Sequence, residues 1–197
     1  MALFTRKTKR LIIRPLALSD FVEWKTYFSS MSPPQNKWDN KNRDPSDLSK
    51  PSFRKILKSQ KNLRDSDKFF DLAVFFFFSG KIVGTVAAMD VLRGLGQTSY
   101  LGYFIHNKFW GKGYGKEATL AMIDIAFRDI KLHRIEAGIE PSNRRSIMLA
   151  RSIGLRKEGL KKRAVYLRGK WNDLVMYSAT CEEFGVEWKG TPKTRPR

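Results

Sequence analysis

Hydrophobic residues in the middle of the chain gather into three runs that favour β-strands. The runs cover 69–78, 81–91 and 98–105, and aromatic and β-branched side chains are frequent in them. Ser79-Gly80 separates the first two runs, and Arg93-Gly94-Leu95-Gly96 separates the second and third. Because short turns of this kind join antiparallel neighbours, the pattern predicts a meander of antiparallel strands.

A change to helical periodicity follows the meander. A glycine-rich loop over 111–116 precedes apolar residues at Leu120, Ile123 and Phe127, which predicts an amphipathic helix over 117–129. The other elements expected in this half are a strand over 133–139, a helix over 144–152 closed by Gly154, and a hairpin with strands over 160–167 and 171–180.

The first third of the chain has a strand pattern, two helical patterns and a long polar segment. The strand is expected over 9–16, and the helices are expected to begin at the caps Ser19-Asp20 and Ser52. Between the helices, 29–51 is rich in Pro, Asn, Asp and Ser and is predicted to be a loop that borders an acceptor site.

Composition is typical of one globular domain. The chain has 197 residues, of which 42% are hydrophobic and 29% charged, and it contains no repeat. We therefore expect a single domain over 1–197, with its core in about 9–180 and a basic, frayed tail over 187–197. No apolar run approaches the length of a membrane span, and the N-terminal residues do not resemble a signal peptide, so we expect a cytoplasmic protein.

Two features narrow the chemistry. Cys181 is the only cysteine, so we expect neither an intramolecular disulfide nor any cysteine-based metal site, and no metal is expected. The formal net charge is +19 and the isoelectric point is about 10.2. Such a charge favours RNA, DNA, an anionic membrane face or a multiply phosphorylated cofactor, although a solubilising basic surface would give the same composition.

The glycine-rich loop is a candidate anion site. In Trp110-Gly111-Lys112-Gly113-Tyr114-Gly115-Lys116, glycine permits positive φ and close approach of a ligand, and the amides of the following helix point to one place. No Gly-Lys-Ser/Thr follows, as a Walker loop requires, and the antiparallel strands before it do not suit a dinucleotide fingerprint. A plain glycine turn is the alternative.

Ordered motifs around this loop resemble those of the GNAT acetyltransferase superfamily. Its cofactor pattern is Gln/Arg-x-x-Gly-x-Gly/Ala; Gly113 and Gly115 occupy the fourth and sixth places, and Trp110 stands in the first. Further along the chain, 133–137 resembles the next strand of the family, Asn143 to Ser146 resembles an Asn-x-x-Ser helix start, and 149–159 is similar to the run that follows it in the family. Two segments resemble the Rim-type ribosomal-protein acetyltransferases in particular: 169–173 matches their G-x-W-x-D hairpin, and 10–16 matches their first strand. The resemblance covers about 10–180 and is weakest across 29–66.

The resemblance implies an α+β GNAT fold, in which helices flank a mixed, mostly antiparallel sheet. The strand before the glycine loop would be bulged and would splay from the next strand, opening a slot for acetyl-CoA. Backbone amides near Phe104 and Ile105 would polarise the thioester carbonyl. Asn143 would bind the pantetheine arm or cap its helix. The residues whose amides would hold the pyrophosphate are Lys112, Gly113, Tyr114, Gly115 and Lys116.

The same resemblance implies direct attack of an amine on the thioester. Ser146 corresponds to an acid used near the leaving thiolate, and Tyr166 to a phenol used elsewhere in the superfamily; a surface hydroxyl and a packed aromatic are the alternatives. A water relay to Glu136 or Glu140 would serve as the base, because Val165 replaces a glutamate found in some Rim-type enzymes. His106, His133 and Cys181 are weaker candidates.

The acceptor expected from the resemblance is the N-terminal amine of a ribosomal protein. We also expect the protein to contact ribosomal RNA through its basic surface, to have no membrane association, and to be a monomer or a homodimer. Two alternatives remain: a GNAT enzyme for a small amine such as an antibiotic or polyamine, and an inactive ribosome- or RNA-binding protein.

Overall fold

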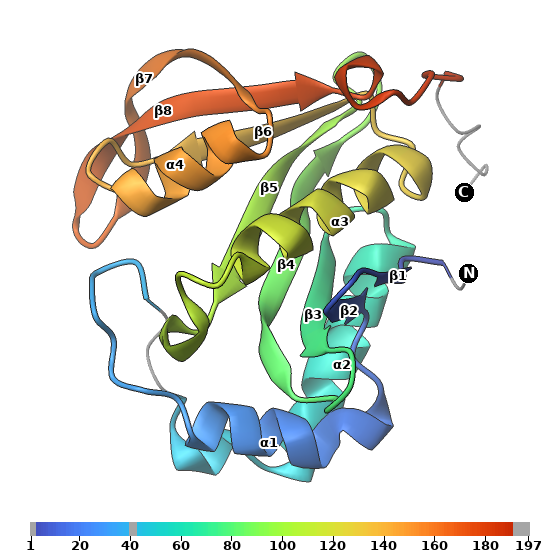
Figure 1. Ribbon diagram of the computed structural model, residues 1–197, viewed down its shortest axis with the longest axis vertical. Helices are drawn as coiled ribbons and strands as arrows, with labels where there is room; N and C mark the ends of the chain where they lie inside the picture. Colours follow the sequence, from blue (N-terminus) through green and yellow to red (C-terminus); the bar gives the residue numbers. More distant parts are fainter. Residues whose placement is uncertain (1–2, 40–42, 191–197) are drawn as a thin grey trace.

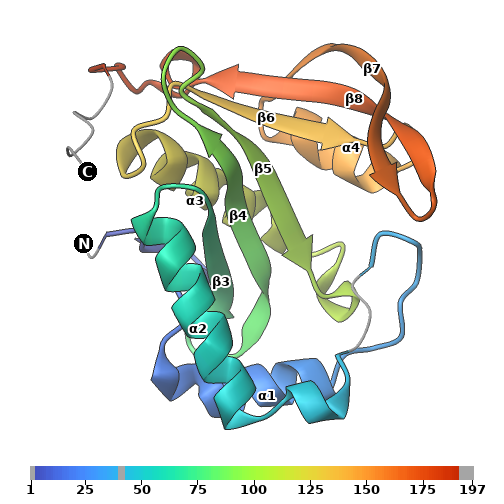
Figure 2. The same ribbon diagram turned by 180° about the vertical axis from the view of Figure 1, so that it is seen from behind.

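The computed structural model describes residues 3–39 and 43–190. One eight-stranded sheet, in the order β1-β2-β3-β4-β5-β6-β8-β7, runs through the molecule with helices on both faces (Figure 1 and Figure 2). The strands are β1 Arg6–Lys7, β2 Leu11–Arg14, β3 Phe70–Phe76, β4 Ile82–Leu92, β5 Thr98–Ile105, β6 Arg134–Ile139, β7 Arg156–Leu167 and β8 Lys170–Thr180. The α-helices are α1 Phe21–Ser29, α2 Lys50–Asp65, α3 Tyr114–Arg128 and α4 Arg144–Ser152.

The predicted meander is confirmed. β3, β4 and β5 pair antiparallel, with Leu72 opposite Val86 and Thr85 opposite Phe104. The expected bulge lies elsewhere: the register of β4 and β5 shifts between Met89 and Leu92, where one extra residue enters β4, and not at the end of β5.

Alternation along the strands fills a core on each face of the sheet. On one face, Leu72 and Val74 of β3 join the core that includes Met122 of α3 and Ala150 of α4. On the other face, Ala73 and Phe75 join a smaller core with Trp24 of α1 and Phe53 of α2. The sheet is therefore buried on both sides where it supports α3.

Some helix ends differ from the predictions. Ser49, not Ser52, caps α2, and its hydroxyl accepts the Ser52 amide at 3.2 Å. Asp20 precedes α1, but its carboxylate binds the Ala17 amide and the Arg14 guanidinium, so it does not cap that helix. α3 begins at Tyr114, three residues earlier than predicted, because Gly111 and Gly113 adopt positive φ whereas Gly115 does not, so the helix can include Gly115.

β5 and β6 are the only parallel neighbours in the sheet, and they separate soon after they meet. Their pairing covers 98–100 with 134–136 and ends there, so the rest of the two strands diverges (Figure 1). The predicted loop over 29–51 is largely irregular, although part of it, 40–42, and the tail after 190 lie outside the described residues. Among the helices of the described chain, none has the length and apolar character needed to span a membrane.

Candidate active site

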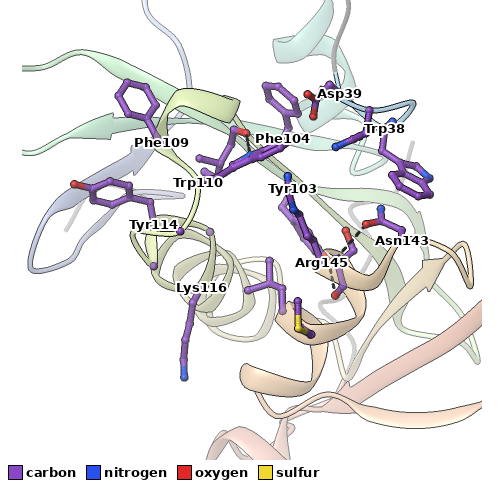
Figure 3. A pocket seen from close by; sticks show the side chains of 18 residues that line it. Trp38, Asp39, Tyr103, Phe104, Phe109, Trp110, Tyr114, Lys116, Asn143 and Arg145 are labelled. Carbon is purple, nitrogen blue, oxygen red and sulfur yellow. Dashed lines mark hydrogen bonds between the residues drawn. The ribbon is translucent and has the colours of Figure 1, made fainter. Parts of the chain in front are cut away.

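A cavity of about 560 Å³ lies between the end of β5, the start of α3 and the first turns of α4 (Figure 3). It contains eight of the twelve residues predicted for the site: Phe104, Ile105, Gly113, Tyr114, Gly115, Lys116, Asn143 and Ser146. The predicted residues that do not line it are Lys112, Glu136, Glu140 and Tyr166. The structure thus brings together most of the cofactor residues, while three of the four catalytic candidates lie outside the cavity.

The first turn of α3 presents its amides to this cavity. Gly113 has φ of +78°, a left-handed conformation that turns the chain into the helix without a Cβ clash. Glu117 donates the first backbone bond, to the Gly113 carbonyl at 3.1 Å, so the amides of Tyr114, Gly115 and Lys116 precede the intrahelical ladder. Their orientation and the positive end of the helix dipole make an anion site.

Arg10, which directly precedes β2, fixes this turn. Its Nη1 donates to the Lys112 carbonyl at 2.8 Å, and its Nε donates to Glu117 Oε2 at 2.7 Å. Burial raises the pKa of Glu117, but hydrogen bonds from Thr8 and Arg10 outweigh it and lower the pKa overall. Glu117 therefore stays ionised, and its negative charge is balanced by the ion pair with Arg10.

The space next to the turn fits a diphosphate and a narrow chain. A Cβ at Gly115 would lie 3.5 Å from Leu149 Cδ2 and 3.8 Å from Ile105 Cγ1, so a larger side chain would enter the cavity between α3 and α4. Lys116 also lines the cavity and adds a positive charge. Lys112 is exposed and does not line the cavity, and its carbonyl is bound by Arg10 in the turn.

The end of β5 forms one side of the cavity, and Trp110 supports it. Trp110 Nε1 donates to the Ile105 carbonyl at 2.6 Å, and the Arg145 guanidinium lies 4.2 Å from the centre of the Trp110 ring. Gly84 of β4 faces Ile105, where a Cβ would lie 2.0 Å from the Phe104 carbonyl oxygen. Trp110, in a place where glutamine or arginine is commoner, therefore braces the strand end.

The first turn of α4 forms the opposite side. Asn143 caps this helix by accepting the Ser146 amide at 3.2 Å, as the capping alternative predicted. Tyr103 of β5 reaches across the cavity and donates its hydroxyl to the Ser146 carbonyl at 3.2 Å (Figure 3). Burial raises the pKa of Tyr103, so its phenol remains protonated at neutral pH.

Glu140 joins three segments just after β6 ends, beside Trp38, which lines the cavity. Its carboxylate accepts Lys37 Nζ at 2.8 Å and Trp38 Nε1 at 3.0 Å, and it pairs with Arg168 of the β7–β8 turn. Burial raises the pKa of Glu140, but these donors outweigh it and lower the pKa overall. Every donor holds the charged form, so Glu140 holds these segments together, and its role as a proton acceptor stays a prediction.

Glu136 and Tyr166 lie outside the cavity, so their predicted catalytic roles stay predictions. Glu136 pairs with Arg134 at 2.9 Å on β6. Tyr166 lies on the edge strand β7, is 60% exposed, and its ring contacts Trp171 at a centroid distance of 5.6 Å. Both β6 and β8 lie between this outermost strand and β5, whose end lines the cavity.

The family profile described as the acetyltransferase (GNAT) domain matches residues 10–156, which is most of the chain. The chain belongs to the GNAT acetyltransferase family. The fold agrees: the crystal structure of a ribosomal-protein-S5-alanine acetyltransferase from Vibrio fischeri superposes with a TM-score of 0.79 at 26% identity, covering 94% of this chain and 99% of that one.

Two curated GNAT relatives are similar in sequence. A probable N-acetyltransferase of Bacillus subtilis (strain 168), YjcK, is 35% identical over 120 residues, or 61% of this chain and 66% of that protein. The [ribosomal protein uS5]-alanine N-acetyltransferase of Escherichia coli (strain K12) is 36% identical over 104 residues, or 53% of this chain and 54% of that protein. The chain thus matches between about half and two thirds of the length of these relatives.

The long loop after α1 supplies cavity residues that the sequence motifs did not indicate. Asn36, Trp38 and Asp39 line the cavity, and Asp39 Oδ2 accepts the Gln35 amide at 2.7 Å. His106, at the end of β5, accepts the Ser32 amide through Nε2 at 2.8 Å. The prediction that this loop borders the site holds for its described part, but the individual residues could be found only once the loop was placed against β5.

A separate cluster lies at the far end of β8. Possible ligand atoms of His133, Cys181 and Glu182 lie within 4.8 Å of one another, although their spacing in the sequence does not indicate it. Burial, followed by the charge of Glu182, raises the pKa of Cys181 to about 11, so the thiol is protonated at neutral pH. A protonated, buried thiol is a poor nucleophile.

Proposed function

We propose that this protein transfers the acetyl group of acetyl-CoA to a primary amine, with both substrates bound together. The observation that carries this proposal is the cavity between the end of β5, α3 and α4, which Tyr114, Gly115 and Lys116 of the first turn of α3 line. A diphosphate at their amides would leave the rest of the cavity as the path for an extended pantetheine arm, with Asn143 and Ser146 on the other side. Membership in the GNAT family supports the same reaction class.

The reaction needs few groups from the protein. Acetyl-CoA supplies a thioester whose carbonyl carbon forms a bond with the amine nitrogen; the carbon–sulfur bond breaks, the amine loses a proton and the thiolate gains one. We propose that amides at Phe104 and Ile105 face the carbonyl oxygen, where hydrogen bonds would be strongest as negative charge develops. Gly84 and Trp110 would hold that strand end in place.

The proton for the thiolate is assigned to Tyr103, with Ser146 as the second candidate. The ordinary pKa of a phenol is near 10, far closer to that of a thiol than the pKa of a serine hydroxyl is. Burial raises the pKa of Tyr103 above this value, so the phenol would keep its proton until a thiolate forms beside it. Both residues line the cavity, and the Ser146 carbonyl orients the Tyr103 hydroxyl at 3.2 Å. Tyr103 therefore takes the role that the family resemblance assigned to Tyr166.

The amine needs little help to lose its proton. An N-terminal amine has a pKa of about 7.7–8.0, so a useful fraction is neutral near pH 7. Asp39 is placed to orient the amine or to receive its proton through water, and it is the one carboxylate lining the cavity in the described chain. Glu140 would act through the loop that it holds, not by contact with the amine.

The acceptor that we propose is the N-terminal amine of a ribosomal protein, reached while the enzyme is next to ribosomal RNA. Similarity to the Escherichia coli uS5-alanine acetyltransferase supports this acceptor, and the net charge of +19 supports the RNA contact. A polyamine is the second candidate, but it would favour several carboxylates, whereas the described lining combines Asp39 with Lys116 and Arg145.

Mass spectrometry of a ribosomal-protein mixture tests the proposed reaction. After incubation with the enzyme and acetyl-CoA, we expect one ribosomal protein to gain the mass of one acetyl group at its N-terminus. The matched control is Gly115→Leu, which blocks the cavity beside α3 and should give no gain. Acetylation of spermidine but of no protein amine would reject the acceptor class, and acetylation of neither would reject the proposed reaction.

A further inference from the structure

We infer that the basic hairpin, defined as residues 156–171 of β7 and β8, is a binding surface for single-stranded RNA. This inference deepens the proposed function, because it gives the enzyme a means of docking beside an acceptor that is part of a ribonucleoprotein. RNA binding by the hairpin needs neither acetyl-CoA nor a reactive amine, so it can succeed or fail independently of catalysis.

The charge of the molecule is concentrated in this hairpin. Its 16 residues include seven lysines or arginines and one glutamate, a net charge of +6 out of +19 for the whole chain. Arg156 and Arg168 pair with carboxylates. In the described chain the other five basic side chains are exposed and have no carboxylate within ion-pair distance; they are Lys157, Lys161, Lys162, Arg163 and Lys170. Unpaired basic side chains are available for phosphates.

An exposed aromatic pair lies among these charges. Tyr166 and Trp171 are directly opposite each other in the hairpin, next to its turn, and each is 60% exposed. Their rings are 5.6 Å apart at 64°, an edge-to-face arrangement that leaves the outer ring faces open to solvent. A base has a flat face of similar size, and stacking of one base on such a ring contributes about 1–3 kcal/mol.

Protection of an edge strand does not explain this composition. β7 is the last strand of the sheet, and lysines on an edge strand discourage pairing with other chains. Charged side chains alone are enough to prevent such pairing, whereas an exposed tryptophan beside an exposed tyrosine would favour association with other chains. Basic side chains interleaved with aromatic rings are instead the combination that single-stranded nucleic acids require.

The position of the hairpin connects this surface to the active site. Arg168, in the turn, pairs with Glu140, which also accepts a hydrogen bond from Trp38 of the cavity lining. Trp171 is on the same side of β8 as Tyr177, whose hydroxyl accepts a hydrogen bond from Arg151 of α4, since alternate residues of a strand share a face. RNA on the hairpin would therefore lie beside α4, which adjoins β7 and β8 in Figure 1 and whose first turns line the cavity.

RNA is preferred over an acidic protein because of the rings. Acidic side chains would form ion pairs with the lysines but would offer no planar group to stack on Tyr166 and Trp171. A flexible single strand can place its phosphates on Lys161 and Lys162 and its bases on the rings together.

Fluorescence anisotropy with a fluorescein-labelled, mixed-sequence RNA of about 12 nucleotides tests the inference directly. The test variant is Lys161→Glu/Lys162→Glu, and the matched control is Lys55→Glu/Lys58→Glu on the exposed face of α2, which removes the same net charge. We expect affinity to fall at least about 30-fold for the hairpin variant and less than about 3-fold for the control. Trp171→Ala should weaken binding about 10-fold without altering net charge.

Each outcome decides the matter. Equal losses for the two charge variants would show that the overall field binds RNA and would overturn the hairpin assignment, as would the absence of RNA binding by the native chain. Oligoglutamate of equal charge should bind at least about tenfold more weakly than RNA, because it offers no base to stack; equal binding would assign the surface to acidic proteins instead. Unchanged melting and acetyl-CoA affinity of each variant would establish that the fold and the catalytic site are intact.

Discussion

The two walls of the cavity are built by different means. The β5–α3 wall presents main-chain amides, which glycines at 113 and 115 expose, and Arg10 secures the turn from behind. The α4 wall and its adjoining loop present side chains from 36–39 and 143–149, which Glu140 and Asn143 hold in place. The first wall suits a ligand that every member of the family shares, whereas the second can change with the acceptor.

This difference has a physical basis. Main-chain donors cannot change with a substitution, so a glycine turn preserves an anion site while neighbouring side chains vary. Side chains on a long loop can vary freely, and loops commonly carry specificity for this reason. We therefore expect changes on the α3 wall to affect acetyl-CoA binding and changes on the loop side to affect the acceptor.

The largest effect is expected on the α3 wall, from Gly115→Leu. The new side chain would lie between Ile105 and Leu149, where the pantetheine arm would pass. Acetyl-CoA affinity should fall at least about 100-fold, which corresponds to about 2.7 kcal/mol. Isothermal titration calorimetry measures the loss. The melting temperature should not fall, since leucine favours a helix more than glycine does; unchanged affinity would contradict the assignment of this wall.

Tyr103 spans both walls, and its removal should affect turnover more than binding. In Tyr103→Phe the ring remains while the proton donor is lost, so kcat should fall about 100-fold with little change in acetyl-CoA affinity. Ser146→Ala should lower kcat less than about fivefold. Steady-state kinetics with a peptide acceptor compares the two, and a larger loss in Ser146→Ala would transfer the acid role to Ser146.

Glu140→Gln should affect the acceptor side alone. The amide can still accept the Trp38 hydrogen bond but cannot pair with Lys37 and Arg168. We expect KM for the acceptor to rise about tenfold, acetyl-CoA affinity to stay the same, and the free energy of unfolding to drop by about 1–3 kcal/mol. A rise in KM for acetyl-CoA of equal size would remove the distinction between the walls.

The effect of pH on this variant follows from the sign of the pKa shift. The pKa of Glu140 in the folded chain is below its ordinary value of 4.5. The carboxylate therefore stabilises the fold fully above that value, and the stabilisation is lost as pH falls through the folded pKa. The difference in melting temperature between the native chain and Glu140→Gln should be constant near neutral pH and should shrink in acid. A difference that persisted in strong acid would show that pairing by the carboxylate is not its cause.

The smallest effect is expected from Trp110→Phe. It removes the 2.6 Å bond to the Ile105 carbonyl and weakens the contact with Arg145, while most of the ring packing remains. Loss of one hydrogen bond should cost about 1 kcal/mol in stability and up to about fivefold in acetyl-CoA affinity. Chemical denaturation and calorimetry measure the two quantities. Full loss of binding would mean that Trp110 contacts the ligand instead of bracing β5.

Sequence predicted the α3 wall well because its determinants are local. Glycines at 113 and 115, followed by a helical pattern, specify a turn and a helix start within a few residues. The meander was predictable for the same reason, since alternation and short turns act over neighbouring residues. The start of α3 was misplaced, because the first turn of a helix carries no periodic signal of its own, and the bulge expected in β5 lies in β4 instead.

The loop side could not be predicted in the same way. Lys37 precedes Glu140 by about a hundred residues and Arg168 follows it by about thirty, and nothing in the sequence around these residues marks them as partners. Tyr166 was expected at the site but does not line the cavity, because a family position gives a place in the chain but not the side of the strand or its distance from the cavity. Tyr103 was not expected to line the cavity, because its strand pattern predicts burial and not a position across a cavity.

The most direct measurement is the nuclear magnetic resonance of backbone amides during titration with acetyl-CoA. If the first turn of α3 holds the diphosphate, the amide signals of Gly113, Tyr114, Gly115 and Lys116 should shift most, together with those of Phe104 and Ile105. Signals of the basic hairpin should stay where they are. Saturating acetyl-CoA that left the 113–116 amides unshifted would contradict the assignment of this turn as the cofactor site.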